Sequence, residues 1–235
     1  MNSELLGLVL LLELVLAIST TAPLTLSGKF TKHPNLGIAI WFVLLTVSFV
    51  AALAAVLIAF SSVFQSYFSL QAGQDLGEIL LISFAPWILL AFAGVLLAIT
   101  NLRLAPYFQA RERNLDLNQL SKPTGTLFEG VSVRELAVPG YFAITRAGVI
   151  YLSSAALALD KVRLEAVLWH ELGHIRLQHQ ALKAVSAFAL TIAPWFLVSK
   201  VFSFEVARLC EIAADRYAMR HVNGKVLSEA RSLFL

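Results

Sequence analysis

The sequence predicts a mainly α-helical membrane protein, in which three N-terminal transmembrane helices precede a small α+β domain. The 235-residue chain is 58% hydrophobic and only 14% charged, so it is more apolar than an ordinary soluble domain. The apolar residues are concentrated in the first hundred positions, whereas helical and strand-like patterns alternate after them. We therefore expect a transmembrane region over residues 1–100 and a separate domain over residues 101–235.

Three apolar stretches are long enough to cross a bilayer as helices: residues 5–22, 37–60 and 79–100. The first is not expected to be a cleaved signal peptide, because it starts with Glu4 instead of basic residues and Glu13 interrupts its apolar run. Glu13 has two interpretations. It is either functional, as intramembrane carboxylates often are, or a protonated group that faces the helix bundle, and we favour the second.

The loop charges predict the orientation of these spans. The first connection carries Lys29 and Lys32, and the second carries no basic residue. Four basic residues follow the third stretch: Arg103, Arg111, Arg113 and Lys122. Because basic loops stay on the cytoplasmic side, we expect the N-terminus outside and residues 101–235 in the cytoplasm.

A small antiparallel sheet is expected early in the domain. Residues 131–138, 141–145 and 149–152 have strand-like composition, and residues 146–148 form a turn signal between the last two. The polar stretch 114–130 is expected to be an irregular linker. If an edge of this sheet borders the functional site, it offers a place for an extended peptide. Alternatively the sheet only covers the helices, and both interpretations stay open.

A helix over residues 161–179, capped by Asp160, carries the most informative motif, His-Glu-Leu-Gly-His at positions 170–174. Histidines four residues apart lie on one face of a helix, so His170 and His174 can bind the same metal ion. Glu171 lies where it can polarise a metal-bound water. Gly173 allows another element to approach this helix closely.

Residues 181–201 are apolar and long enough to suggest another span. A single crossing would place Glu211 on the other side of the membrane from His170, which a shared metal ion forbids. Pro194 also interrupts the run. We therefore expect an apolar hairpin over about 181–203 that does not span, with a break near Pro194.

A last helix over residues 204–221, ended by Asn223-Gly224, carries Glu211 and Asp215 on one face. Two histidines and a glutamate around Zn²⁺, with a fourth position open, form a catalytic type of site. Asp215 is expected to accept the N–H of a ligating histidine. The alternative is a solvated acidic face, paired with nearby arginines.

The segments 166–175 and 205–218 resemble integral-membrane gluzincin metallopeptidases, and most of all the beta-lactam-sensing receptor proteases of the BlaR and MecR type. Residues 149–154 also resemble the strand that precedes their active-site helix. The chain is similar to a short form without the sensor domain, so antibiotic sensing is not carried over. HtpX and CAAX-type zinc peptidases are related more distantly, because they place two spans between the same motifs.

The resemblance implies a zincin-like domain and a membrane-embedded zinc endopeptidase of the bacterial inner membrane. His170, His174 and Glu211 would be the metal ligands, with Glu171 as general base and acid and Asp215 behind the ligands. The substrate would be a cytoplasmic or membrane-proximal protein, with a regulatory role. Tyr217, His221 and His179 are candidates for stabilising the developing oxyanion.

Two other function classes remain at this stage. One is a non-catalytic membrane regulator whose metal site is structural or vestigial, which the intact Glu171 disfavours. The other is a transporter component, which Glu13 and the spans alone suggest. The net charge of +3 with no basic stripe gives no case for nucleic-acid binding. Three spans form only a thin helix bundle, which is compatible with a homo-oligomer.

Overall fold

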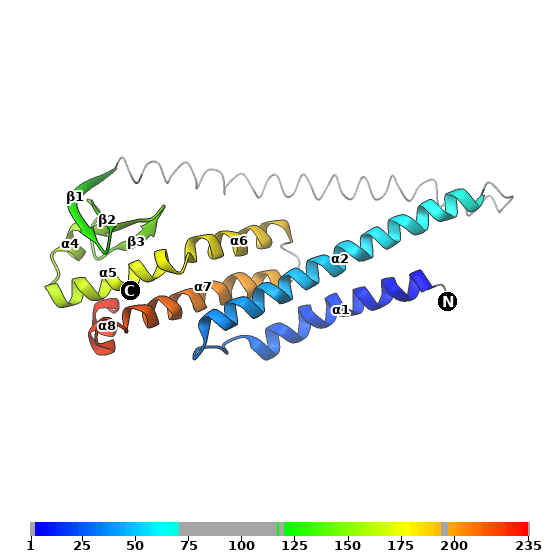
Figure 1. Cartoon of the computed structure of the whole chain (residues 1–235), viewed down its shortest axis with the longest axis horizontal. Helices are drawn as coiled ribbons and strands as arrows, with labels where there is room; N and C mark the ends of the chain where they lie inside the picture. The colour runs from blue at the N-terminus through cyan, green and yellow to red at the C-terminus, as the bar shows by residue number, and fades with distance from the viewer. Residues whose placement is uncertain (1–2, 71–116, 118–119, 194–196, 235) are drawn as a thin grey trace. The chain divides into compact units, whose positions relative to one another are not determined.

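The computed structural model describes residues 3–70, 117, 120–193 and 197–234 (Figure 1). The described part is mostly helical with one small mixed sheet. The chain divides into two compact units. The first comprises Met1–Ser27, Ala39–Ala105 and Leu190–Phe202, and the second comprises Gly28–Ile38, Pro106–Ala189 and Ser203–Leu235.

The first unit contains the first long apolar helix and all of the second except its first residues, Pro34–Ile38. Helix α1 spans Ser3–Leu26 and helix α2 spans Pro34–Leu70, so helices form where the first two spans were predicted. Among the described residues only Pro34–Ile58, with a mean hydropathy of 2.6, is long and apolar enough to cross a membrane. The described residues therefore support one candidate span instead of three, and the predicted third span, 79–100, lies outside them.

Helix α2 exposes much of its apolar surface. Several large side chains in its candidate span are more than half exposed: Val43, Val50, Leu53, Val56 and Leu57. A soluble protein rarely leaves such a continuous apolar surface uncovered. Trp41 on the same helix is fully buried, so α2 also has a packed face.

The sheet in the second unit has the strand order β1-β2-β4-β3. Its strands are β1 (Ser121–Phe128), β2 (Val131–Leu136), β3 (Ala143–Arg146) and β4 (Val149–Ser153). The prediction of an antiparallel sheet was wrong in one pairing, because β2 and β4 are parallel, with Val133 opposite Ile150. The chain passes from β2 beyond the position of β4 before it turns back, so β3 becomes an outer edge.

Strand β1 lies inside the stretch that was predicted to be an irregular linker, and that prediction was wrong for residues 121–128. The polar composition of residues 121–128 gave no strand signal, because β1 is an edge strand whose side chains are mostly exposed. Its pairing with β2 is irregular between Pro123 and Leu127. Proline is tolerated at such edge positions, since no ladder partner needs its missing N–H.

The helices of the second unit carry the candidate site. They are α4 (Ser154–Leu157), α5 (Lys161–Arg176), α6 (His179–Ile192), α7 (Leu197–Ala218) and α8 (Gly224–Arg231). The Asp160 side chain caps α5 by accepting the Arg163 N–H at 3.0 Å, as predicted. The predicted helix over 161–179 is divided, because α5 ends at Arg176 and α6 begins at His179.

The last helices also differ from the prediction. The break before Pro194 is confirmed at Ala193, but the helix predicted to start at 204 is continuous from Leu197 in α7. Asn223 does not stop that helix. Its side chain accepts the Lys225 N–H at 2.9 Å and caps α8, a helix the sequence prediction lacked.

The core of the second unit fixes α5 against the sheet (Figure 1). Ile150 and Leu152 of β4 are fully buried and cluster with Ala166 of α5 and with Leu227 and Ala230 of α8. One face of α5 is thereby used for packing. Its other buried face carries the histidines, so the core determines where they point.

Candidate metal centre

Helices α5 and α7 approach each other closely at Gly173. A Cβ atom placed on Gly173 would lie 3.1 Å from Ala214 Cα and 3.3 Å from the Ala214 carbonyl oxygen. Backbone atoms cannot move aside as a flexible side chain would, so this position favours glycine. The predicted role of Gly173 is confirmed, and its small size brings Glu211 of α7 next to the histidines of α5.

The candidate ligands form a compact triangle that could hold a metal ion. The Nε2 atoms of His170 and His174 lie 3.2 Å apart, and they lie 3.5 and 3.6 Å from the two carboxylate oxygens of Glu211. A tetrahedral site with metal–ligand bonds of about 2.0–2.2 Å requires neighbouring ligand atoms to be about 3.3–3.5 Å apart. The three donors are therefore spaced as three ligands of one tetrahedral metal ion would be.

Asp215 lies behind the first histidine, one helical turn beyond Glu211. Its Oδ1 accepts the Nδ1–H of His170 at 2.8 Å, and Nε2 of His170 faces Glu211. Arg231 of α8 pairs with the other oxygen of Asp215. The structure thus places Asp215 against His170, and α8 adds a cation that pairs with Asp215.

The charges of this cluster are strongly coupled. Burial would lower the pKa of His170, but hydrogen bonds to Asp215 and Glu211 outweigh it and raise that pKa to about 9. Burial would raise the pKa of Glu211, but hydrogen bonds with His170, His174 and Lys183 outweigh it and hold that pKa below its ordinary range. A concentrated negative charge beside two imidazoles is the environment that a cation would stabilise.

His179, at the start of α6, contacts the second histidine. The Nδ1 atoms of His174 and His179 lie 2.9 Å apart, and His179 is 1% exposed. Burial, with His174 and Lys183 nearby, lowers the pKa of His179 to about 3, so its ring is neutral. When His174 uses Nε2 as a ligand, its Nδ1–H must donate to Nδ1 of His179.

Replacing His179 with leucine is expected to weaken zinc binding by about 10–100-fold, the usual effect of losing the partner of a metal-ligating histidine. The loss has a physical cause, since the buried Nδ1–H of His174 would have no acceptor. Competition with a chromophoric chelator measures the zinc affinity. His179→Asn, which returns a carbonyl acceptor, should recover part of it, and equal affinities for wild type and His179→Leu would contradict the assignment.

Glu171 is held by the edge strand of the sheet. The Thr145 hydroxyl on β3 donates to Oε2 of Glu171 at 2.6 Å, and both residues are buried. This contact joins residues 26 positions apart. The sequence prediction placed Thr145 in a strand but gave no signal for this partnership. Thr145 leaves the other oxygen of Glu171 available to a water or a proton.

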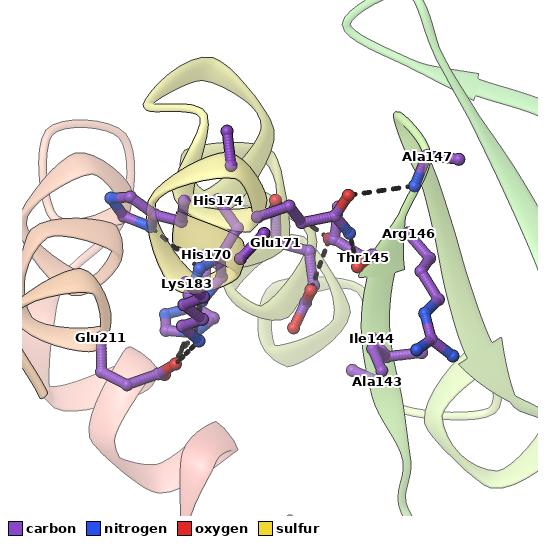
Figure 2. Close-up of a pocket in the computed structure, with 14 residues that line it drawn as sticks. Ala143, Ile144, Thr145, Arg146, Ala147, His170, Glu171, His174, Lys183 and Glu211 are labelled. Atoms are coloured by element: carbon purple, nitrogen blue, oxygen red, sulfur yellow. Dashed lines mark hydrogen bonds and ion pairs between the residues drawn. The ribbon is translucent and has the colours of Figure 1, made fainter. Parts of the chain in front are cut away.

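The cluster opens into a pocket of about 800 Å³ between α5, α6, α7 and the edge strand β3 (Figure 2). Figure 2 shows Glu171 directed toward Thr145 and Lys183 directed toward Glu211, at 2.9 Å. The lining includes residues 143–147 of β3 and its turn, along with His170, His174 and Glu211. The edge of the sheet therefore borders the pocket, which is the condition that the sequence analysis set for peptide binding along this edge.

The side chain of Gln180 occupies part of that edge. Its Oε1 accepts the backbone N–H of Ala147 at 3.1 Å, and its Nε2 donates to the carbonyl of Thr145. These backbone groups point away from β4. They are the groups with which another extended chain would pair, so the Gln180 amide stands where one residue of such a chain would bind.

Two of the predicted oxyanion-stabilising candidates do not line the pocket. His221 stacks on Trp169 with ring centroids 3.5 Å apart, and Tyr217 lies beside the same ring. Those side chains are used for packing between α5 and α7. Apart from the histidines, the basic residues among the described residues that line the pocket are Arg146 and Lys183. The sequence analysis did not name either of them as an oxyanion-stabilising candidate.

No family model and no curated protein matches this sequence.

Proposed function

We propose that this protein is a membrane-embedded zinc endopeptidase that hydrolyses peptide bonds of a cytoplasmic or membrane-proximal protein, as its resemblance to BlaR/MecR-type gluzincins implies. The observation that carries the proposal is the combination of three donors at tetrahedral spacing with a separate carboxylate, Glu171, in the same pocket. A purely structural metal site is usually closed by four protein ligands. Here only His170, His174 and Glu211 form the group of described residues, so one position stays open.

The donor chemistry fits zinc. Two imidazoles and one carboxylate form a ligand set used by catalytic zinc sites, where a water or the substrate takes the fourth position. A zinc ion held there would act as a Lewis acid on the scissile carbonyl and would lower the pKa of a bound water. Asp215 and His179 contact the Nδ1 atoms of the two imidazoles, so both Nε2 atoms would be available to hold such an ion together with Glu211.

Glu171 is the proton carrier of the proposed reaction. The oxygen that Thr145 does not engage takes a proton from the attacking water as the water oxygen bonds to the carbonyl carbon. The same carboxyl then gives this proton to the amide nitrogen as the C–N bond breaks. Lys183 or Arg146, both in the pocket, supplies an N–H toward the developing oxyanion.

The substrate is proposed to bind as an extended strand along β3. An outer strand presents unpaired backbone groups, and a peptide that adds to it gains main-chain hydrogen bonds. Thr145 belongs to this strand and also holds Glu171, so a peptide paired there would pass beside the general base. The substrate must displace the Gln180 amide, since both use the Thr145 carbonyl and the Ala147 N–H.

Two features support a membrane location: the exposed apolar surface of helix α2, and the set of chain segments that form the second unit. The exposed apolar side chains of Pro34–Ile58 suit a lipid environment. The segment Gly28–Ile38, which comprises a loop and the start of α2, belongs to the same compact unit as the His170–Glu211 cluster. This agrees with the predicted topology, in which the basic loop with Lys29 and Lys32 and the peptidase domain share the cytoplasmic side.

The decisive experiment combines metal content with cleavage. Protein purified in detergent should contain about one zinc per chain by elemental analysis and should cleave an unfolded substrate such as β-casein. A chelator should stop cleavage, and zinc should restore it. Zinc without any cleavage of casein or of a peptide library would favour the non-catalytic regulator, and absence of zinc after resupply would overturn the proposal.

Zinc affinity is expected to rise with pH, by about tenfold per unit between about pH 6 and 9 and little above that. Zinc needs neutral His170, and hydrogen bonds to Asp215 and Glu211, against the opposing effect of burial, raise its pKa to about 9. The metal-free fold should show the opposite trend. The raised pKa stabilises it fully below 6.5, and this contribution is lost as pH rises toward 9. Competition titrations at several pH values measure the affinity, and a flat profile would contradict the coupling.

A further inference from the structure

A second pocket, of about 250 Å³, lies in the second unit at the first turn of α2. One wall is the segment that leads into α2, and the other is the outer face of α7 with the end of α5. This volume is about twenty times the ~10–15 Å³ that a single water requires. Its lining is Lys32, His33, Pro34, Asn35, Leu36, Leu177, Ala213, Arg216, Tyr217 and Arg220.

The charge of this pocket is positive and uncompensated. Lys32, His33, Arg216 and Arg220 line it, and no acidic residue does. Within the described ranges no carboxylate forms an ion pair with any of these four side chains, whereas Arg208 on α7 pairs with Glu205 at 2.7 Å. Positive groups gathered in a cavity without a carboxylate form a binding site for an anion.

The wall of the pocket is held in place by α7. The Glu205 carboxylate accepts the Gly28 N–H at 3.2 Å, Arg208 donates to the Lys29 carbonyl at 2.9 Å, and Arg216 donates to the Lys32 carbonyl. Phe30 packs so closely on α2 that a Cβ at Gly37 would lie 2.6 Å from its Cβ. These contacts hold the loop backbone against α7, so Lys32 and His33 start from defined positions beside Arg216 and Arg220.

We propose that this pocket binds the phosphate group of an anionic phospholipid. The residues that line it begin the candidate span Pro34–Ile58, so insertion of that helix places the pocket at the level of the lipid headgroups. Several basic side chains around one cavity suit a phosphate, which accepts many hydrogen bonds and carries charge. The inference rests on the membrane insertion of α2 in the proposed function and not on its zinc chemistry.

The test uses the full chain in a neutral detergent and native mass spectrometry with added phosphatidylglycerol or phosphatidylcholine. Wild-type protein should retain phosphatidylglycerol more tightly. The double variant Lys32→Gln/Arg220→Gln removes two charges that line the pocket and keeps Arg208 and Arg216, which hold the loop. This variant should weaken phosphatidylglycerol binding by roughly 30-fold. The matched control Lys161→Gln/Lys225→Gln removes two exposed charges elsewhere in the same unit and should bind as wild type does.

Three outcomes would overturn the inference. They are equal retention of both lipids, unchanged phosphatidylglycerol binding in the pocket variant, and displacement of the lipid by millimolar inorganic phosphate, which would make free phosphate the ligand. Flotation with liposomes separates this inference from the proposed function. Protein that does not float contradicts the membrane location itself, whereas protein that floats without lipid preference contradicts only the lipid site.

Discussion

Glu171→Gln is expected to retain zinc and to lose peptide cleavage, with a decrease in kcat of about 10²–10⁴-fold. Glutamine has nearly the same shape as glutamate and keeps an oxygen that accepts the Thr145 hydroxyl, which lies 2.6 Å from the carboxylate. It cannot take a proton from water. The variant therefore separates proton transfer from folding and from metal binding, since Glu171 is not among the three donors that could hold a metal ion.

The measurement is casein or peptide cleavage beside zinc content, for wild type and variant prepared in parallel. Thr145→Val provides a graded control. It keeps a carboxylate at Glu171 but removes the hydrogen bond that orients it, so its loss of kcat should be smaller than that of Glu171→Gln. A Glu171→Gln variant with full activity and full zinc would show that another group carries the proton, or that the cleavage comes from a contaminant.

The sequence predicted the parts of the site that depend on local periodicity. His170 and His174 share a face because they are four residues apart on one helix, and Glu211 and Asp215 share a face for the same reason. Gly173 was recognised because a missing side chain in an apolar helix indicates close packing. The prediction that these two helices lie together needed only this spacing and one chemical requirement. Donors to a shared metal ion must lie close to one another.

The parts that the sequence did not predict depend on contacts between distant segments. Thr145 meets Glu171 only because β3 ends up as the outer strand, and that follows from the parallel pairing of β2 with β4. A pattern of alternating residues shows which face is buried but not which strand lies beside which. The sequence analysis placed His179 on the same helix as His174. The contact between the two rings was therefore not predicted, because it depends on the end of α5 at Arg176 and the start of α6 at His179.

The composition of a segment also misled where burial is partial. Strand β1 is mostly exposed and therefore polar, and α8 is a short helix in a stretch that read as a terminator. Helix α8 matters to the site because Arg231 pairs with Asp215. An element without a strong apolar pattern can thus supply a residue that orients Asp215, the partner of His170.

Glu211→Ala is expected to reduce zinc affinity by more than the 10–100-fold that loss of an outer hydrogen-bond partner costs, because it removes a direct ligand. The substitution also leaves two cations beside the site. Lys183 and Arg231 now lie 2.9 and 3.6 Å from the Glu211 oxygens, and both would repel the ion once that carboxylate is gone. Zinc content after dialysis against a weak chelator measures the effect.

Glu165→Ala is the matched control, since Glu165 is an exposed carboxylate on α5 and should leave zinc unchanged. Glu211→Gln separates the two causes of the loss, because an amide oxygen remains near the ion while the negative charge is removed. If Glu211→Gln retains much more zinc than Glu211→Ala, the oxygen is a ligand and not only a counter-charge. Full zinc retention in both variants would mean that the ion is bound elsewhere, and then the proximity of α5 and α7 at Gly173 would be a packing feature alone.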